Sequence, residues 1–124
     1  MTQNDKKKTL VLGASDNPSR YSYLAIHQLR KHDHPVAAIG KKHTRVADVE
    51  IEKEKKQFTG IDTVTLYLNP LRQQQYYDYI LSLKPKRIIF NPGAENDELA
   101  NLAKQNNILP MEACTLVLLS TGQY

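Results

Sequence analysis

Small residues, hydroxyl groups and one arginine are concentrated directly after the first apolar run, in Gly13-Ala14-Ser15-Asp16-Asn17-Pro18-Ser19-Arg20-Tyr21-Ser22. Small side chains let backbone N–H groups approach a phosphate, and a helix that begins after such a loop adds partial positive charge. The hydroxyls of Ser15, Ser19 and Ser22 and the guanidinium of Arg20 are suitable donors to phosphate oxygens. An ordinary strand-to-helix turn, with serine as a cap and Pro18 as a helix start, explains any single residue equally well. The segment as a whole favours phosphate binding.

The same loop lacks the glycines of two common nucleotide motifs. Of the G-x-G-x-x-G pattern only Gly13 is present, and G-x-x-x-x-G-K-[ST] is absent. NAD-binding domains also place an acidic residue at the end of the second strand, where this chain has Gly40 and Lys41. A cation there suits a ribose that carries a phosphate, as in NADP or coenzyme A (CoA), although Lys41, Lys42 and Arg45 could equally form a solvated turn. A branched side chain at position 13 is expected to displace the phosphates and leave the protein folded.

Two Asn-Pro dipeptides follow later strands, as Asn69-Pro70 and as the start of Asn91-Pro92-Gly93. If these strands run parallel to the first, both dipeptides face the cleft formed by the Gly13 and Lys41 loops. A proline ring suits a flat adenine or an extended amide-bearing arm. Asn-Pro is also a common end to a strand, and Gly93 indicates either a close approach by the backbone or a simple turn.

The elements that must position these loops alternate between strands and helices. We expect strands over residues 8–13, 36–39, 62–68 and 87–90, a weaker third strand within 46–51, and a brief one at 108–109. Helices are expected over 22–31, 71–83, 97–106 and 114–119, with Asn96 as the N-cap of the third. This alternation predicts an α/β fold, a small doubly wound Rossmann-like domain with a mainly parallel sheet of five or six strands in the order 3-2-1-4-5. The ligand site then lies where the chain reverses direction, between the first strand and the strand at 62–68.

Composition limits the alternatives. The 124 residues carry a net charge of +4 and one cysteine, which indicates a single domain (1–124, with residues 1–7 as a flexible arm) without a disulfide framework. No signal peptide or membrane span is evident, so we expect a cytoplasmic protein that makes no contact with membranes. The four histidines lack metal-ligand spacing, which predicts no metal site. Nucleic acid is the least favoured partner, because no recognition helix or aromatic sheet motif is present.

The Gly13-Ala14-Ser15 loop, the turn over residues 91–96 and Cys114 together resemble the small stand-alone CoA-binding proteins, which are similar to the CoA-binding domain of the succinyl-CoA synthetase alpha subunit. The resemblance extends from about Lys8 to Leu119. It implies that the first loop holds CoA phosphates, that residues after the second strand approach the 3′-phosphate, and that the Pro-containing turn borders adenine or pantetheine. The candidate site it gives is Gly13, Ala14, Ser15, Pro18, Arg20, Ser22, Gly40, Lys41, Asn69, Pro70, Pro92 and Gly93.

Two features depart from that family. Many members have Asn-Pro directly after the second strand, where this chain has Gly40-Lys41, and residues 44–60 match no family pattern. No serine, histidine and aspartate set forms a nucleophile elbow, so we expect a binder of CoA or acyl-CoA without catalytic machinery of its own. The alternatives are an NADP-binding oxidoreductase component and a subunit of a CoA-ligase-type enzyme, and the macromolecular partner would be a second copy or a partner enzyme. Cys114 is expected to be a buried structural cysteine rather than the site of a mixed disulfide with the coenzyme thiol.

Overall fold

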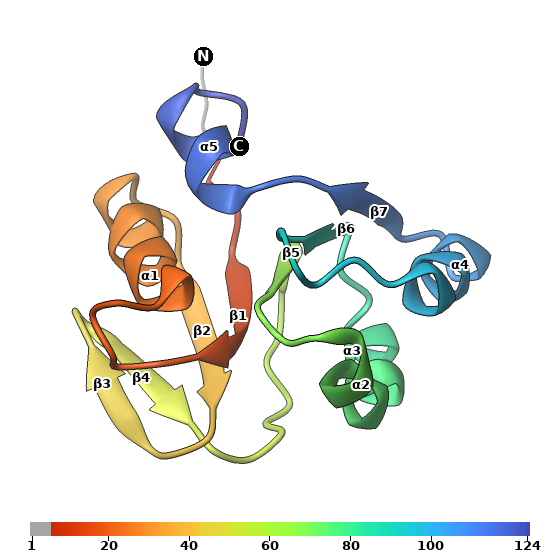
Figure 1. The fold of residues 1–124 in the computed structure, drawn as a ribbon, viewed down its shortest axis with the longest axis horizontal. Coiled ribbons are helices and arrows are strands. Elements are labelled where there is room, and N and C mark those ends of the chain that lie inside the picture. Colours follow the sequence, from red (N-terminus) through yellow and green to blue (C-terminus); the bar gives the residue numbers. More distant parts are fainter. Residues whose placement is uncertain (1–5) are drawn as a thin grey trace.

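A single sheet of seven strands, in the order β3-β4-β2-β1-β5-β6-β7, runs through the computed structural model, which describes residues 6–124 (Figure 1). Only β3 and β4 pair in antiparallel fashion, and every other neighbouring pair of these strands is parallel. The strands are β1 (Thr9–Ala14), β2 (Val36–Gly40), β3 (Thr44–Val46), β4 (Val49–Glu52), β5 (Thr63–Leu66), β6 (Arg87–Phe90) and β7 (Leu109–Glu112).

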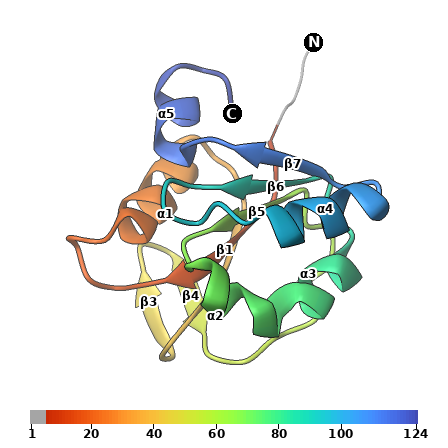
Figure 2. The same cartoon turned by 45° about the vertical axis from the view of Figure 1, so that its right-hand side comes forward.

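Helices cover both faces of this sheet, as the two views of the ribbon show (Figures 1 and 2). They are α1 (Tyr21–Lys31), α2 (Pro70–Gln73), the 3₁₀ turn η1 (Gln74–Tyr76), α3 (Tyr77–Leu83), α4 (Asp97–Gln105) and α5 (Thr115–Ser120). Alternation along β1 divides the core, because Leu10 and Leu12 pack with residues of α3 and α4, whereas Val11 packs with residues of α1 and α5. The predicted doubly wound architecture is therefore confirmed.

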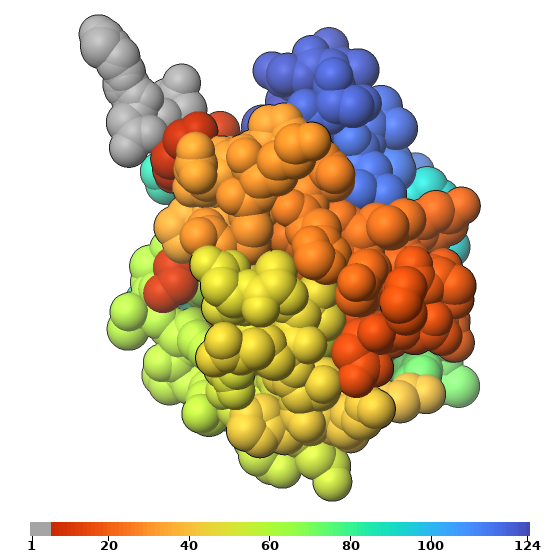
Figure 3. All heavy atoms as spheres, turned by 90° about the vertical axis from the view of Figure 1, so that its left-hand side faces the viewer, coloured from red at the N-terminus to blue at the C-terminus, as the bar shows by residue number. Residues whose placement is uncertain are grey.

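The predicted order of strands is also confirmed, with β4 as the third strand. The sheet is wider than expected because the weak pattern within 46–51 forms a hairpin rather than one strand. Ala47 adopts a positive φ of 54° in its turn and allows β3 to fold back on β4. The Arg30 guanidinium holds this hairpin against α1 through an ion pair with Asp48 at 2.9 Å. In Figure 3 the hairpin (yellow) lies below α1 (orange), beside the loop that precedes α1.

The segment after β5 differs most from the prediction. The strand expected over 62–68 ends at Leu66, and the helix expected over 71–83 is divided into α2, η1 and α3. Helix α2 begins one residue earlier than predicted because Asn69 caps it. The Asn69 side chain accepts a hydrogen bond from the Arg72 backbone N–H at 2.9 Å, and Pro70 occupies the first helical turn. This cap turns the chain back across the carboxyl end of β5. The Asn96 cap of α4 is confirmed by bonds from the N–H groups of the first turn.

Residues 1–5 of the predicted flexible arm lie outside the described residues. Of the remainder, the Lys7 backbone N–H donates to Nδ1 of the buried His34 at 2.9 Å. None of the helices in the described part of the chain has the length and apolar character needed to cross a membrane.

Candidate functional site: a cationic cleft at the carboxyl ends of the strands

A cleft of about 670 Å³ opens at the carboxyl ends of the strands, on either side of β1. This is the point where the chain, having formed β2 on one side of β1, crosses to form β5 on the other side. The lining comes from the loops after β1, β2, β5 and β6 and from the starts of α1 and α2: Gly13, Ala14, Ser15, Asp16, Ser19, Arg20, Tyr21, Ser22, Ile39, Gly40, Lys41, Lys42, Thr44, Tyr67, Leu68, Asn69, Arg72, Gln75, Tyr76, Pro92, Gly93 and Ala94.

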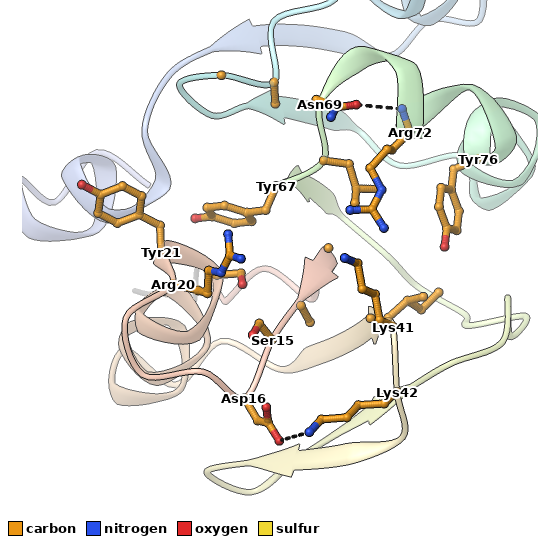
Figure 4. A pocket seen from close by; sticks show the side chains of 18 of the residues that line it. Ser15, Asp16, Arg20, Tyr21, Lys41, Lys42, Tyr67, Asn69, Arg72 and Tyr76 are labelled. Atoms are coloured by element: carbon orange, nitrogen blue, oxygen red, sulfur yellow. Dashed lines mark hydrogen bonds and ion pairs between the residues drawn. The ribbon is translucent and has the colours of Figure 1, made fainter.

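The loop after β1 is held by bonds within itself. The Asn17 backbone N–H donates to Oγ of Ser15 at 3.0 Å, which leaves the Ser15 hydroxyl hydrogen available for an acceptor in the cleft. The Asn17 side chain in turn accepts from the backbone N–H of Ser19 at 3.0 Å. Arg20 occupies the N-cap position of α1 and makes no side-chain cap bond, and its guanidinium extends toward the cleft (Figure 4).

Two glycines in this region have structural roles that do not depend on a ligand. Gly13 has a φ of +93°, and a Cβ there would lie 3.0 Å from the Tyr67 carbonyl carbon and oxygen. A branched residue at position 13 would therefore strain the backbone and press on the Tyr67 carbonyl group, so a loss of stability is expected beside any loss of binding. That such a variant still folds remains a prediction. A Cβ on Gly40 would lie 2.2 Å from the Ala14 carbonyl oxygen, so the absence of a side chain lets β2 end directly against the β1 loop.

The lysines after β2 differ in their surroundings. Nζ of Lys42 lies 3.3 Å from Oδ2 of Asp16, and the Thr44 hydroxyl donates to the same oxygen at 2.9 Å. The Thr44 hydrogen bond and then the Lys42 ammonium lower the pKa of Asp16, which keeps this carboxylate ionised and compensated. Arg45 is likewise paired, with Glu50 at 2.6 Å. The solvated-turn interpretation therefore describes Lys42 and Arg45, whereas the Lys41 side chain has no ion-pair partner among the described residues and points into the cleft (Figure 4).

The opposite wall carries a cation that the sequence analysis did not identify. Arg72, in α2, projects toward the side of the cleft from which Lys41 comes (Figure 4). Like Lys41 and Arg20, its side chain forms no hydrogen bond or ion pair with the described residues. Three cationic groups for which residues 6–124 supply no compensating carboxylate thus surround one opening.

Tyr67 forms part of the cleft lining, and its hydroxyl is buried without a hydrogen-bond partner in the described part of the chain. Burial raises the pKa of Tyr67, so the phenol keeps its proton.

Buried amides tie together the strand ends next to the cleft. Nδ2 of Asn91 donates to Oγ1 of Thr65 at 2.7 Å and to the Leu66 carbonyl at 2.9 Å, and its Oδ1 accepts from the Thr115 N–H at 2.9 Å. This amide therefore joins β5, the end of β6 and the start of α5.

A second buried amide joins the two loops that carry the Asn-Pro dipeptides. Nε2 of Gln73 donates to the carbonyls of Leu68 and Ala94, at 2.8 Å each. The loops after β5 and β6 are consequently fixed relative to one another, and with them the Asn69 and Gly93 sides of the cleft.

The structure brings together every residue of the predicted site except Pro18 and Pro70, which are exposed and lie outside the cleft lining. Pro70 instead begins α2, and the side-chain oxygen of the adjacent Asn69 accepts the N-terminal capping hydrogen bond of that helix. Lining residues absent from the predicted set include Tyr67, Arg72 and Tyr76. Arg72 could have been found from the sequence, because a helix capped by Asn69 must place its first turn at the same sheet end as the Asn-Pro dipeptide.

Other candidates lie away from this cleft. Cys114 is half-buried directly before α5, rather than fully buried, and is not part of the cleft lining. Within residues 6–124 no group of three or more histidine, cysteine or acidic side chains is placed to hold a metal ion.

A mainly parallel sheet with helices on both faces and a cleft at its switch point defines an α/β domain of the Rossmann-like class. Residues 7–120 match the CoA binding domain family, and the chain belongs to that family. The resemblance noted in the sequence is thereby confirmed.

Solved structures share this fold. An uncharacterized protein is 50% identical, with a TM-score of 0.94 over 98% of this chain and 100% of that chain. Prb, a redesign for binding of the protein PH1109, is 18% identical, with a TM-score of 0.84 over 95% of this chain and 84% of that chain. Cell-free ID.343 from Thermus thermophilus is also 18% identical, with a TM-score of 0.80 over 96% and 91% of the two chains, so these last two show the fold alone. No curated protein matches the sequence.

Proposed function

We propose that this protein binds coenzyme A or an acyl-CoA in the cleft at the carboxyl ends of β1, β2, β5 and β6. The observation that carries the proposal is the convergence of Arg20, Lys41 and Arg72 on one opening where the described residues offer them no counterion. Unpaired cations around a concave site attract a polyanion of matching size. Membership of the CoA binding domain family supports CoA as that polyanion.

The proposed pose follows from the loops. The diphosphate lies against the Gly13–Ser15 backbone, where the Ser15 hydroxyl and the Arg20 guanidinium are both free to donate. The ribose 3′-phosphate lies toward Lys41, beyond the end of β2. Pro92 and Gly93 border the adenine or the pantetheine arm, and the region around Gly93 is open enough for close approach, since a Cβ there would meet no atom within 4 Å.

The role we propose is binding rather than catalysis. Asp16, the carboxylate among the described lining residues, is paired with Lys42 and accepts from Thr44, so it is poorly placed to exchange protons with a ligand. The Tyr67 hydroxyl, a second titratable group of the lining, is buried and holds its proton. Chemistry on a bound acyl-CoA would then be supplied by another protein.

Calorimetric titration with CoA, dephospho-CoA, NADP and NAD tests the proposal. CoA is expected to bind best and dephospho-CoA more weakly, because a charge-assisted bond to the 3′-phosphate contributes about 1.5–3 kcal/mol. Binding of NADP without binding of CoA would replace this proposal with the oxidoreductase alternative. A failure of all four to bind would contradict the assignment of the cleft as a nucleotide site.

A further inference from the structure

We propose that Lys41 and Arg72 hold one phosphate monoester between them, from opposite walls of the cleft, so that the site selects nucleotides with a phosphorylated ribose. This inference rests on the proposed function and adds a selectivity device to it. It also assigns Arg72 a role in specificity that neither the resemblance nor the sequence motifs gave it.

The two cations come from opposite sides of the switch point. Lys41 directly follows β2, on one side of β1, and Arg72 lies in α2, after β5 on the other side. Both line the same cleft, and in Figure 4 the Lys41 ammonium and the Arg72 guanidinium point toward one another across it. An anion placed between them would contact both walls at once.

Both backbones are anchored, although the side chains are exposed. Arg72 lies between Asn69, whose Oδ1 accepts from the Arg72 N–H, and the fully buried Gln73, whose amide binds two carbonyls. Lys41 follows Gly40, which packs against the Ala14 carbonyl so closely that a Cβ would lie 2.2 Å away. The two side chains therefore project from fixed positions, which lowers the entropy lost when an anion is bound.

The charged groups nearest to Lys41 and Arg72 have other partners, so these two cations remain available to a ligand. The Asp16 carboxylate is compensated by Lys42, and the neighbouring cation Lys55 donates to the Gln75 carbonyl at 2.6 Å and lies over the Tyr76 ring at 5.1 Å from its centroid. Two facing cations repel one another, and a phosphate between them adds two attractions over shorter distances that outweigh this repulsion.

The two groups suit a monoester chemically. A guanidinium presents a planar fork that binds two phosphate oxygens, and an ammonium adds a point charge. A monoester has three terminal oxygens for these donors, whereas each phosphorus of the linear diphosphate has fewer. The geometry thus favours the 3′-phosphate of CoA over its diphosphate as the ligand of this pair.

The test compares CoA with dephospho-CoA on the wild-type protein and on Arg72→Gln. We expect Arg72→Gln to weaken CoA binding about 10- to 100-fold, which corresponds to one charge-assisted contact, and to change dephospho-CoA binding less than about 2-fold. Lys41→Gln should behave in the same way, and Arg72→Lys should retain part of the preference. Arg20→Gln should weaken both ligands equally, because we place it at the diphosphate that they share.

Lys53→Gln is the matched control, since it removes one positive charge from an exposed position outside the cleft. It should leave both affinities within about 2-fold of wild type, which would separate a local contact from the overall field of the protein. Thermal unfolding of Arg72→Gln should match wild type, because the Asn69 cap uses the Arg72 backbone rather than its side chain.

Two results would overturn the inference, and they differ in whether the proposed function also fails. If CoA does not bind the wild-type protein, the proposed function and this inference fail together. If CoA binds but Arg72→Gln weakens CoA and dephospho-CoA equally, the proposed function stands and the assignment of Arg72 to the 3′-phosphate is wrong. The second result would place Arg72 at the diphosphate or against the base.

Discussion

Gly13 and Gly93 form a natural pair for testing how the cleft is built. Both have a φ of +93°, a conformation that L-residues rarely adopt, but their surroundings differ. A Cβ on Gly13 would lie 3.0 Å from the Tyr67 carbonyl group and 3.1 Å from Cδ2 of Leu68, whereas a Cβ on Gly93 would meet nothing within 4 Å. Substitution by alanine therefore places an L-residue at the same unfavourable φ at both sites and adds a steric clash at only one.

The expected costs follow from these two contributions. Backbone strain alone should reduce the free energy of unfolding by about 1–2 kcal/mol in Gly93→Ala. Gly13→Ala should lose a further 1–3 kcal/mol or so, because the Tyr67 backbone must move to relieve the overlap. Urea denaturation measures both values, with a shifted midpoint and an unchanged m-value as the sign of a simple loss of stability. Equal losses in the two variants would refute the close packing of the β1 loop against Tyr67.

The remaining predictions concern the buried Asn91 amide and the opposite end of the sheet. Asn91→Leu should lower the free energy of unfolding by about 3–5 kcal/mol in urea denaturation, since it removes three buried hydrogen bonds and leaves the Thr115 N–H unpaired; a loss below about 1 kcal/mol would contradict the role of this amide in joining β5, β6 and α5. Burial, with nearby lysines, lowers the pKa of His34 to about 4 from its usual 6.5, so the neutral form is favoured in the folded state and stability should fall by up to about 3 kcal/mol as pH drops from 6.5 to 4. His34→Gln should flatten that part of the pH profile, and an unchanged slope would assign the loss to other groups.

The arrangement of the sheet was predictable because it depends on patterns that the sequence displays directly. Apolar runs that end in Gly13, Gly40 and the two Asn-Pro dipeptides mark four parallel strands, and the handedness and switch-point rules then place their carboxyl ends together. Most of the candidate cleft follows from that placement alone. The Asn96 cap was equally visible, since an asparagine followed by two acidic residues is a local signal.

What escaped prediction depends on contacts between segments distant in sequence. The hairpin of β3 and β4 was hidden because its turn uses Ala47 at positive φ rather than glycine or asparagine. Lys42 and Lys41 are adjacent and chemically alike, and only the position of Asp16 after another strand separates their roles. The tight packing of Gly40 against Ala14 likewise requires the register of β1 and β2, which no local pattern contains.

Occupancy of the cleft around the β1 loop by CoA is tested most directly by the amide chemical shifts of the protein titrated with CoA. We predict that the largest changes occur at the backbone N–H groups of Gly13, Ser15, Lys41 and Gly93, and that they saturate together. Changes centred instead on the small hollow of about 200 Å³ between α4 and β7, or no saturable change anywhere, would contradict the account.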